Sequence, residues 1–221
     1  MAESGHLHII IADDHPLFRD ALRLTLETRL SAATVEAAGS LDEAAKLIGS
    51  CEVDLVLLDL TMPGVQGLSG LLYLRAQFPS VPVVVISASE DRSIARKCIA
   101  FGAAGFVPKS ANATTINAAI DKVLAGGLFL PTEMEGGDDP DRDAEALAAR
   151  LSALTPQQVR VLMMLSQGLL NKQIAYELSV SEATVKAHVS AILTKLGVES
   201  RTQAVILAAR IGGTMPPQAS G

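Results

Sequence analysis

The chain of 221 residues contains no tryptophan, and aromatic residues make up only 3% of it. Its hydrophobic cores must therefore be built mainly from alanine, valine, leucine and isoleucine. It has only two cysteines, Cys51 and Cys98, whose spacing does not match a metal-binding motif. A disulfide between them is one alternative, but the low cysteine content favours two reduced thiols in a cytoplasmic protein.

Long apolar segments are missing as well. No stretch approaches the ~18 consecutive apolar residues that indicate a membrane span, so no membrane association is expected. Residues 1–6 carry no basic segment ahead of the first apolar run, which argues against a secretory signal. Hydrophobic residues make up 49% of the chain and charged residues 19%, and this balance is ordinary for a soluble globular protein.

Charge is distributed unevenly along the chain. The formal net charge is −6, which by itself argues against nucleic acid as a partner. Residues 131–154 hold seven acidic and two basic side chains, whereas residues 155–221 hold six basic and three acidic ones. The positive C-terminal third therefore permits DNA binding despite the acidic whole.

Short apolar runs alternate with segments of helical periodicity over residues 7–127. Strands are predicted near 8–12, 33–37, 54–58, 82–86 and 104–107. Helices are predicted near 16–30, 41–49, 67–77, 90–101 and 112–125. This alternation predicts an α/β domain with a five-stranded, parallel, doubly wound sheet. We expect the strand order 2-1-3-4-5.

Single polar residues stand where the apolar runs end. Asp13 and Asp14 follow the first predicted strand, and Asp59 follows the third. Ser87 follows the fourth and Lys109 the fifth. Ligands of an open parallel sheet bind outside the carboxyl ends of its strands. The sequence therefore predicts one pocket in which carboxylates, a hydroxyl and an ammonium meet.

Such a pocket suits a divalent cation and a phosphoryl group. The oxygen ligands expected for Mg²⁺ are three carboxylates and one main-chain carbonyl, those of Asp13, Asp14, Asp59 and Thr61. Asp59, between the cation and Lys109, is placed to attack phosphorus as a carboxylate nucleophile. Lys109 would stabilise the transferring oxygens, and Ser87 would donate a hydrogen bond to one of them. His15 is expected to act in the loop or at the helix start rather than as a ligand.

The segments that carry these residues closely resemble the receiver domains of two-component response regulators. The resemblance rests on residues 12–16, 57–64, 86–88 and 106–109. It implies a receiver domain over 1–130. Pro108 is a modest departure, because many receivers have proline just after the lysine instead of before it.

The resemblance also implies a role for each residue of the pocket. The aspartate that matches Asp59 accepts a phosphoryl group from a sensor histidine kinase. The matches to Ser87 and Lys109 contact that group. The aromatic residue that matches Phe106 turns inward as the hydroxyl moves toward the phosphate, although an ordinary core aromatic is an equal alternative. The remaining matches bind Mg²⁺, namely Asp13, Asp14 and the Thr61 carbonyl.

The remainder of the chain changes in character. Residues 131–143 lack periodicity and are rich in glycine, proline and acidic residues, so they predict an exposed linker. Residues 143–154 are weakly helical and could extend this linker as a short helix. The acidic linker, 131–153 in all, could hold the basic domain against another surface in the resting state. A small all-α domain is expected over 154–212 and a flexible tail over 213–221. The four short helices of this all-α domain are predicted at 156–167, 171–178, 182–196 and 201–211.

The second and third of these helices form a predicted helix-turn-helix, with Ser181 capping the second member. The region resembles the LuxR-type DNA-binding domain, and with the receiver it points to the NarL/FixJ group of response regulators. The resemblance places Lys186 and Ala187 toward bases, although a solvated helix face is the alternative for Lys186 and His188. Ser190 stands where relatives often have a basic residue. The full set expected near DNA is Lys172, Thr184, Lys186, Ala187, His188, Ser190 and Lys195.

The expected function is that of a phosphorylation-switched transcription factor that dimerises on double-stranded DNA. A hydrolase of the haloacid dehalogenase type is one alternative, but it needs a second acid two residues after Asp59, where Thr61 stands. Another is a DNA-binding protein whose receiver only dimerises, and the complete set of phosphorylation residues argues against it. We therefore expect no enzymatic activity beyond the protein's own phosphorylation and dephosphorylation.

Overall fold

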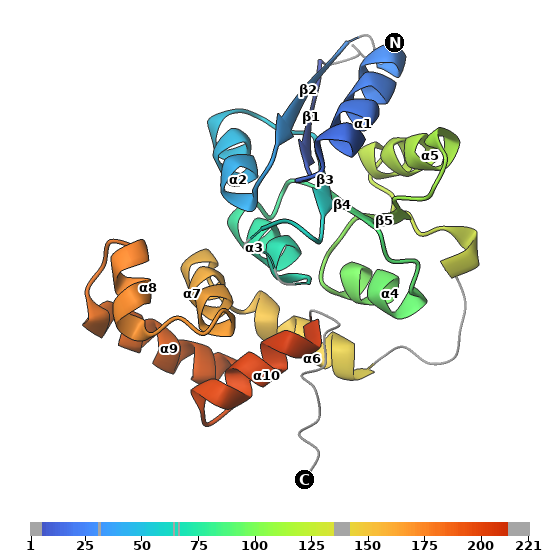
Figure 1. Ribbon diagram of the computed structural model, residues 1–221. Helices are drawn as coiled ribbons and strands as arrows, with labels where there is room; N and C mark the ends of the chain where they lie inside the picture. The colour runs from blue at the N-terminus through green and yellow to red at the C-terminus, as the bar shows by residue number, and fades with distance from the viewer. Residues whose placement is uncertain (1–5, 31, 64, 66, 135–141, 212–221) are drawn as a thin grey trace.

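The computed structural model of the chain describes residues 6–30, 32–63, 65, 67–134 and 142–211. The tail predicted at 213–221 lies outside them. The described residues form an α/β domain and a helical domain that pack against each other (Figure 1). Within these ranges, no helix combines the length and the apolar character that crossing a lipid bilayer requires.

The α/β domain is built on five parallel strands in the order β2-β1-β3-β4-β5, which confirms the predicted order. Their bounds are β1 (Leu7–Ala12), β2 (Ala33–Ala38), β3 (Leu55–Asp59), β4 (Val83–Ser87) and β5 (Gly105–Pro108). The central strands β3 and β4 are buried along their whole length, as expected for strands covered by helices on both faces. Asp59 and Ser87 are the last residues of their strands.

Five helices cover the two faces of the sheet. Their bounds are α1 (Pro16–Arg29), α2 (Leu41–Ser50), α3 (Ser69–Gln77), α4 (Arg92–Ala100) and α5 (Ala113–Leu124). Successive strand residues point to opposite faces, so Ile9 and Ile11 pack with α1 and α5, whereas Ile10 and Ala12 pack with α2, α3 and α4. Ser40 and Asn112 start α2 and α5 as N-caps whose side chains accept a backbone hydrogen bond.

The helical domain carries the predicted helix-turn-helix. Its helices are α7 (Pro156–Ser166), α8 (Asn171–Glu177), α9 (Glu182–Leu196) and α10 (Arg201–Ile211). Thr155 and Gln158 form a reciprocal capping box at the start of α7. Ser181 caps α9, and Ser179 makes the tight turn between α8 and α9 with a left-handed backbone, at φ 53°. α9 is therefore the recognition helix of the pair.

The segment expected to be a linker holds a short 3₁₀ turn, η1 (Thr132–Met134), and a helix, α6 (Arg142–Ser152), on either side of residues 135–141, which lie outside the described ranges. α6 agrees with the helical character predicted for 143–154. Met134 and Leu151 are buried, because apolar positions of these elements pack into the common core. α6 lies beside α3 and α4 of the first domain and α9 of the second.

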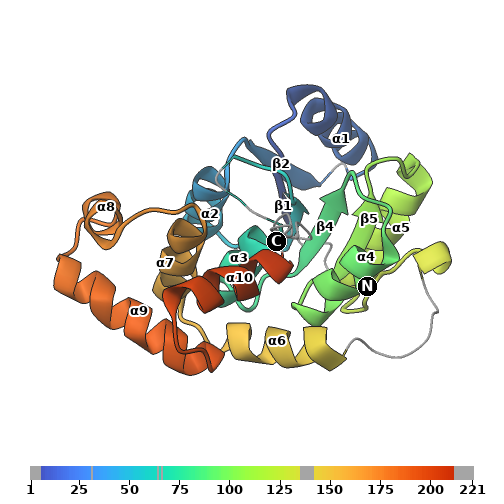
Figure 2. The same cartoon turned by 60° about the horizontal axis from the view of Figure 1, so that its bottom comes forward.

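The two domains share one hydrophobic core. The core on the α2–α3–α4 face of the sheet continues through α6 and α7 into the helix-turn-helix, whereas the core under α1 and α5 stays within the first domain. α7 packs against α3, and an ion pair joins Arg160 to Asp42 of α2 at 3.0 Å. In both Figures 1 and 2, α9 lies on the side of the helical domain that faces away from the sheet.

Candidate functional site

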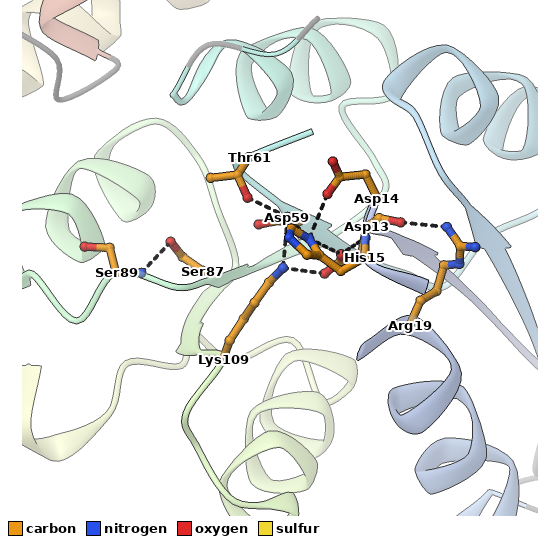
Figure 3. Close-up of polar contacts among 9 residues, drawn as sticks. All are labelled: Asp13, Asp14, His15, Arg19, Asp59, Thr61, Ser87, Ser89 and Lys109. Carbon is orange, nitrogen blue, oxygen red and sulfur yellow. Dashed lines mark hydrogen bonds and ion pairs between the residues drawn. The ribbon is translucent and has the colours of Figure 1, made fainter. Parts of the chain in front are cut away.

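Three carboxylates converge at the carboxyl ends of β1 and β3 (Figure 3). Asp13 and Asp14 follow β1, and Asp59 ends the neighbouring β3. The side chains of Asp13 and Asp59 are 2% and 0% exposed, whereas that of Asp14 is 26% exposed. Parallel pairing of the two strands thus brings together the acids that the sequence places far apart.

Lys109, just after β5, reaches into this cluster. Its Nζ lies 2.7 Å from Asp13 Oδ2 and 2.9 Å from Asp59 Oδ2. Burial lowers the pKa of Lys109, but the hydrogen bonds and charges of the two carboxylates outweigh burial and raise the pKa above its usual value. Lys109 is therefore a permanent cation at neutral pH, and it compensates part of the negative charge.

His15 also joins the cluster, beyond its expected role at the helix start. It occupies the N-cap position of α1, but its side chain makes no capping bond. Instead, Nδ1 lies 2.8 Å from Asp14 Oδ1 and 3.2 Å from Asp13 Oδ1. The ring is 61% exposed, so it lies at the mouth of the pocket. The sequence signal for this contact is the position of His15 directly after two aspartates.

The donor set fits a hard divalent cation. Asp59 Oδ1 is buried and has no hydrogen-bond partner within the described part of the chain. A buried carboxylate oxygen without a partner is costly, and a cation would remove that cost. Mg²⁺ prefers oxygen ligands from one or two carboxylates together with water and phosphate oxygens. The cluster of Asp13, Asp14 and Asp59 can therefore hold Mg²⁺ through carboxylate oxygens.

The remaining residues predicted for the pocket lie around Asp59. The Thr61 hydroxyl donates to Asp59 Oδ2 at 2.8 Å, a contact that the prediction of a carbonyl ligand did not include. Ser87 is buried, and its Oγ accepts a hydrogen bond from the backbone N–H of Ser89, which leaves the hydroxyl hydrogen free to donate elsewhere. Phe106 is fully buried in β5.

The residues predicted to contact DNA lie on α8 and α9, and most of them are exposed. Lys186 forms an ion pair with Glu182, one turn earlier on α9, at 3.2 Å. Lys195 is different, because its Nζ donates to the Ala153 carbonyl at 2.9 Å and to Gln158 Oε1 at 2.7 Å. Sequence reasoning missed this internal role. The exposed residues of the set are Lys172, Thr184, Lys186, Ala187, Ser190 and Lys195, and His188 is partly buried.

Two family models match the chain. The response regulator receiver domain matches residues 9–121, and the bacterial regulatory proteins of the luxR family match residues 152–208. The two matches define a response regulator that combines a receiver with a DNA-binding domain. Because relatives of the NarL type align over nearly the whole chain, the chain belongs to the NarL/FixJ family of response regulators, the transcription regulators of two-component systems.

Relatives and solved structures agree with this assignment. The glycerol metabolism activator of Pseudomonas putida is 42% identical over 213 residues, which is 93% of this chain and 96% of that protein. The nitrate/nitrite response regulator NarP of Escherichia coli K12 is 34% identical over 210 residues, with 94% and 96% covered. RcsB from Salmonella enterica serovar Typhimurium, bound to a promoter with a phosphomimetic, is 25% identical with a TM-score of 0.56 and 95% and 100% covered.

The family assignment bears on the alternatives. Its members are transcription regulators and not classical enzymes, so the hydrolase alternative is set aside. Receiver domains generally bind Mg²⁺ at an acidic pocket, and the aspartate cluster is such a pocket in this chain.

Proposed function

We propose that Asp59 accepts a phosphoryl group from a sensor histidine kinase, and that this modification controls dimerisation and DNA binding. The observation that carries the proposal is the state of the Asp59 carboxylate. One oxygen, Oδ1, is buried without a hydrogen-bond partner among the described residues, while Oδ2 accepts from Lys109 and Thr61. An oxygen held in place and left free is placed to act as a nucleophile.

Each residue around Asp59 has a separate role in the proposed phosphoryl transfer. Asp59 Oδ1 attacks the phosphorus, and the imidazole of the kinase histidine leaves. Lys109 stays charged and stabilises the oxygens of the transferred group. Asp13, Asp14, Asp59 and the Thr61 carbonyl would hold Mg²⁺, which supplies charge neutralisation when bound.

Ser87 and Phe106 are the proposed response elements. The Ser87 hydroxyl keeps a free hydrogen that can be donated to an oxygen of the phosphorylated Asp59. Phe106 lies on β5, paired with Val85 of the strand that ends in Ser87, so a shift of that strand end acts directly on the aromatic ring. The phosphoryl group shifts the equilibrium because its oxygens bind Ser87 and Lys109 in one state only.

The proposed DNA-binding surface lies on α9. We propose that α9 enters the major groove with Lys186 and Ala187 toward bases, and that Lys186 leaves Glu182 when it does so. One solved structure contains two RcsB dimers bound to two parallel DNAs, and we propose a homodimer here as well. Leu17 and Leu24, one heptad apart on α1, are 87% and 65% exposed on a helix that the helical domain does not cover. Such a regulator works where the chromosome lies, in the cytoplasm.

The test uses a small phosphodonor with Mg²⁺ on the full chain. We expect intact mass spectrometry to find one added phosphoryl group, located at Asp59 by peptide analysis, together with a larger dimer fraction and tighter DNA binding. Asp59→Asn should lose all three changes. Asp20→Asn, an exposed acid on α1, is the matched control and should retain them. Absence of the adduct in the unmodified chain would overturn the proposal.

A further inference from the structure

A second group of metal-binding side chains lies at the opposite end of the sheet from Asp59. His8 stands near the start of β1, Glu36 lies in β2, and Cys51 follows the last turn of α2. His8 pairs with Thr34 in the parallel register, so Glu36, two residues further along, lies on the same face of the sheet. α2 covers this face, and its end brings Cys51 to the same place.

The three ligand atoms form a compact group. All of them lie within 4.8 Å of one another, and His8 Nε2 is 2.7 Å from Glu36 Oε2. The His8 side chain is 17% exposed and that of Glu36 is 40% exposed, while Cys51 is exposed. Ligand atoms around a tetrahedral zinc ion are about 3.5 Å apart, so small side-chain rotations are enough to close the group around an ion.

The kinds of ligand select the ion. Imidazole and thiolate are preferred by zinc and related borderline or soft cations, whereas Mg²⁺ and Ca²⁺ take oxygen ligands. We propose that His8, Glu36 and Cys51 form a binding site for Zn²⁺, separate from the acidic pocket, with the fourth position left to water. In the bound state His8 uses Nε2 as a neutral imidazole with its ring hydrogen on Nδ1, and Glu36 binds as a carboxylate. The Cys51 thiol gives up its hydrogen bond to the Leu47 carbonyl and releases its proton to solvent.

Metal binding at this position would affect the stability of the fold. β2 is one of the two edge strands of the sheet and is held on one side only, by β1. An ion bound by all three residues links β2 to β1 and to the end of α2. Zn²⁺ would therefore stabilise the edge of the receiver, because an ion that binds the folded chain raises the free energy of unfolding. The proposal does not depend on phosphorylation of Asp59.

The experiment is a titration of the full chain with Co²⁺, a spectroscopic substitute for Zn²⁺, in excess Mg²⁺ to fill the acidic pocket. A cobalt–thiolate bond gives a near-ultraviolet charge-transfer band that carboxylate sites do not give. We expect this band in the unmodified chain and its loss on addition of Zn²⁺. Zn²⁺ should also raise the thermal unfolding temperature.

The two cysteines supply a matched pair of variants. Cys51→Ala should abolish the band and the thermal effect of Zn²⁺. Cys98→Ala should retain both, because Cys98 is buried and burial raises the pKa of its thiol to about 12. His8→Gln and Glu36→Gln should each weaken Co²⁺ binding by more than about tenfold, since even outer partners of a metal ligand contribute that much.

Three results would overturn the site. One is the absence of the band at saturating Co²⁺. Another is a band that survives in Cys51→Ala. The third is a band whose Co²⁺ affinity is unchanged in both His8→Gln and Glu36→Gln, which would show a lone thiolate in place of a three-ligand site.

Discussion

At the scale of single residues, the centre of the receiver is a balance of charge around Lys109. Its ammonium contacts two carboxylates that are almost completely buried, Asp13 and Asp59. Buried charges are stable only when they are paired. The same lysine that would bind the phosphoryl group therefore also stabilises the unphosphorylated chain.

Lys109→Met is expected to separate these two roles. It leaves Asp13 and Asp59 without their cation, and loss of one partner of a buried pair typically costs about 3–5 kcal/mol. We expect a lower unfolding temperature by calorimetry, tighter Mg²⁺ binding, and recovery of much of the lost stability in Mg²⁺. Since the chain has no tryptophan, calorimetry replaces fluorescence as the readout.

The control for this prediction is Lys46→Met, on the exposed side of α2. It should leave the unfolding temperature and the Mg²⁺ affinity almost unchanged. An unfolding temperature for Lys109→Met equal to that of the control would show that the pocket does not need the lysine for stability.

At the scale of elements, α7 depends on an N-terminus that the sequence specifies clearly. Thr155 accepts from the Gln158 N–H, and the Gln158 side chain accepts from the Thr155 N–H. Gln158 also accepts from Lys195 of α9. The start of α7 is thus bound to the end of the recognition helix, and this contact gives Lys195 a structural role beside its predicted place near phosphate.

Thr155→Ala should therefore destabilise the helical domain. Loss of a threonine N-cap costs about 1 kcal/mol. We expect a lower urea midpoint for the α-helical signal, with an unchanged dependence of the free energy on urea. Thr28→Ala, on the exposed side of α1 with its hydroxyl bonded to the Leu24 carbonyl one turn earlier, should shift stability by less than about 0.5 kcal/mol. Equal shifts for the two variants would contradict the capping box.

The individual elements were more predictable than their contacts. β3 and β4 are continuous apolar runs up to their last residue and β1 is largely apolar. Parallel pairing then brings Asp13 and Asp59 to the same edge of the sheet, so the pocket follows from pattern and topology. The packing of α6 did not follow, because the apolar positions of 142–152 show that one face is buried but not against which partner. The cluster of His8 and Cys51 was hidden for the same reason, since its members come from separate segments.

At the scale of the whole molecule, the receiver carries the helical domain on α2, α3 and α4 and leaves the recognition helix outward. The Arg160–Asp42 ion pair is exposed, so it contributes at most about 1 kcal/mol to this docking, and most of the stabilisation comes from the apolar contacts. Docking therefore restricts the position of α9 without covering it.

Charge reversal tests this docking. Asp42→Arg places like charges together and should increase the undocked fraction, seen as a larger radius of gyration in small-angle scattering. Adding Arg160→Asp should restore the compact form, because the pair is then re-formed with opposite polarity. Affinity for a single half-site should stay constant in both variants. If the single variant is as compact as the double one, the ion pair has no part in the docking.

The continuous core described above also bears on how such regulators can be recombined. Because side chains of α3, such as Leu72 and Tyr73, share a core with α6 and α7, the second domain is not an interchangeable module. A chimera that joins this receiver to the DNA-binding domain of another regulator would need that domain's matching surface as well as its connecting segment. Substitutions on α3 and α7 should therefore be inherited together within a lineage, whereas the opposite face of the sheet, under α1 and α5, is free to diverge separately.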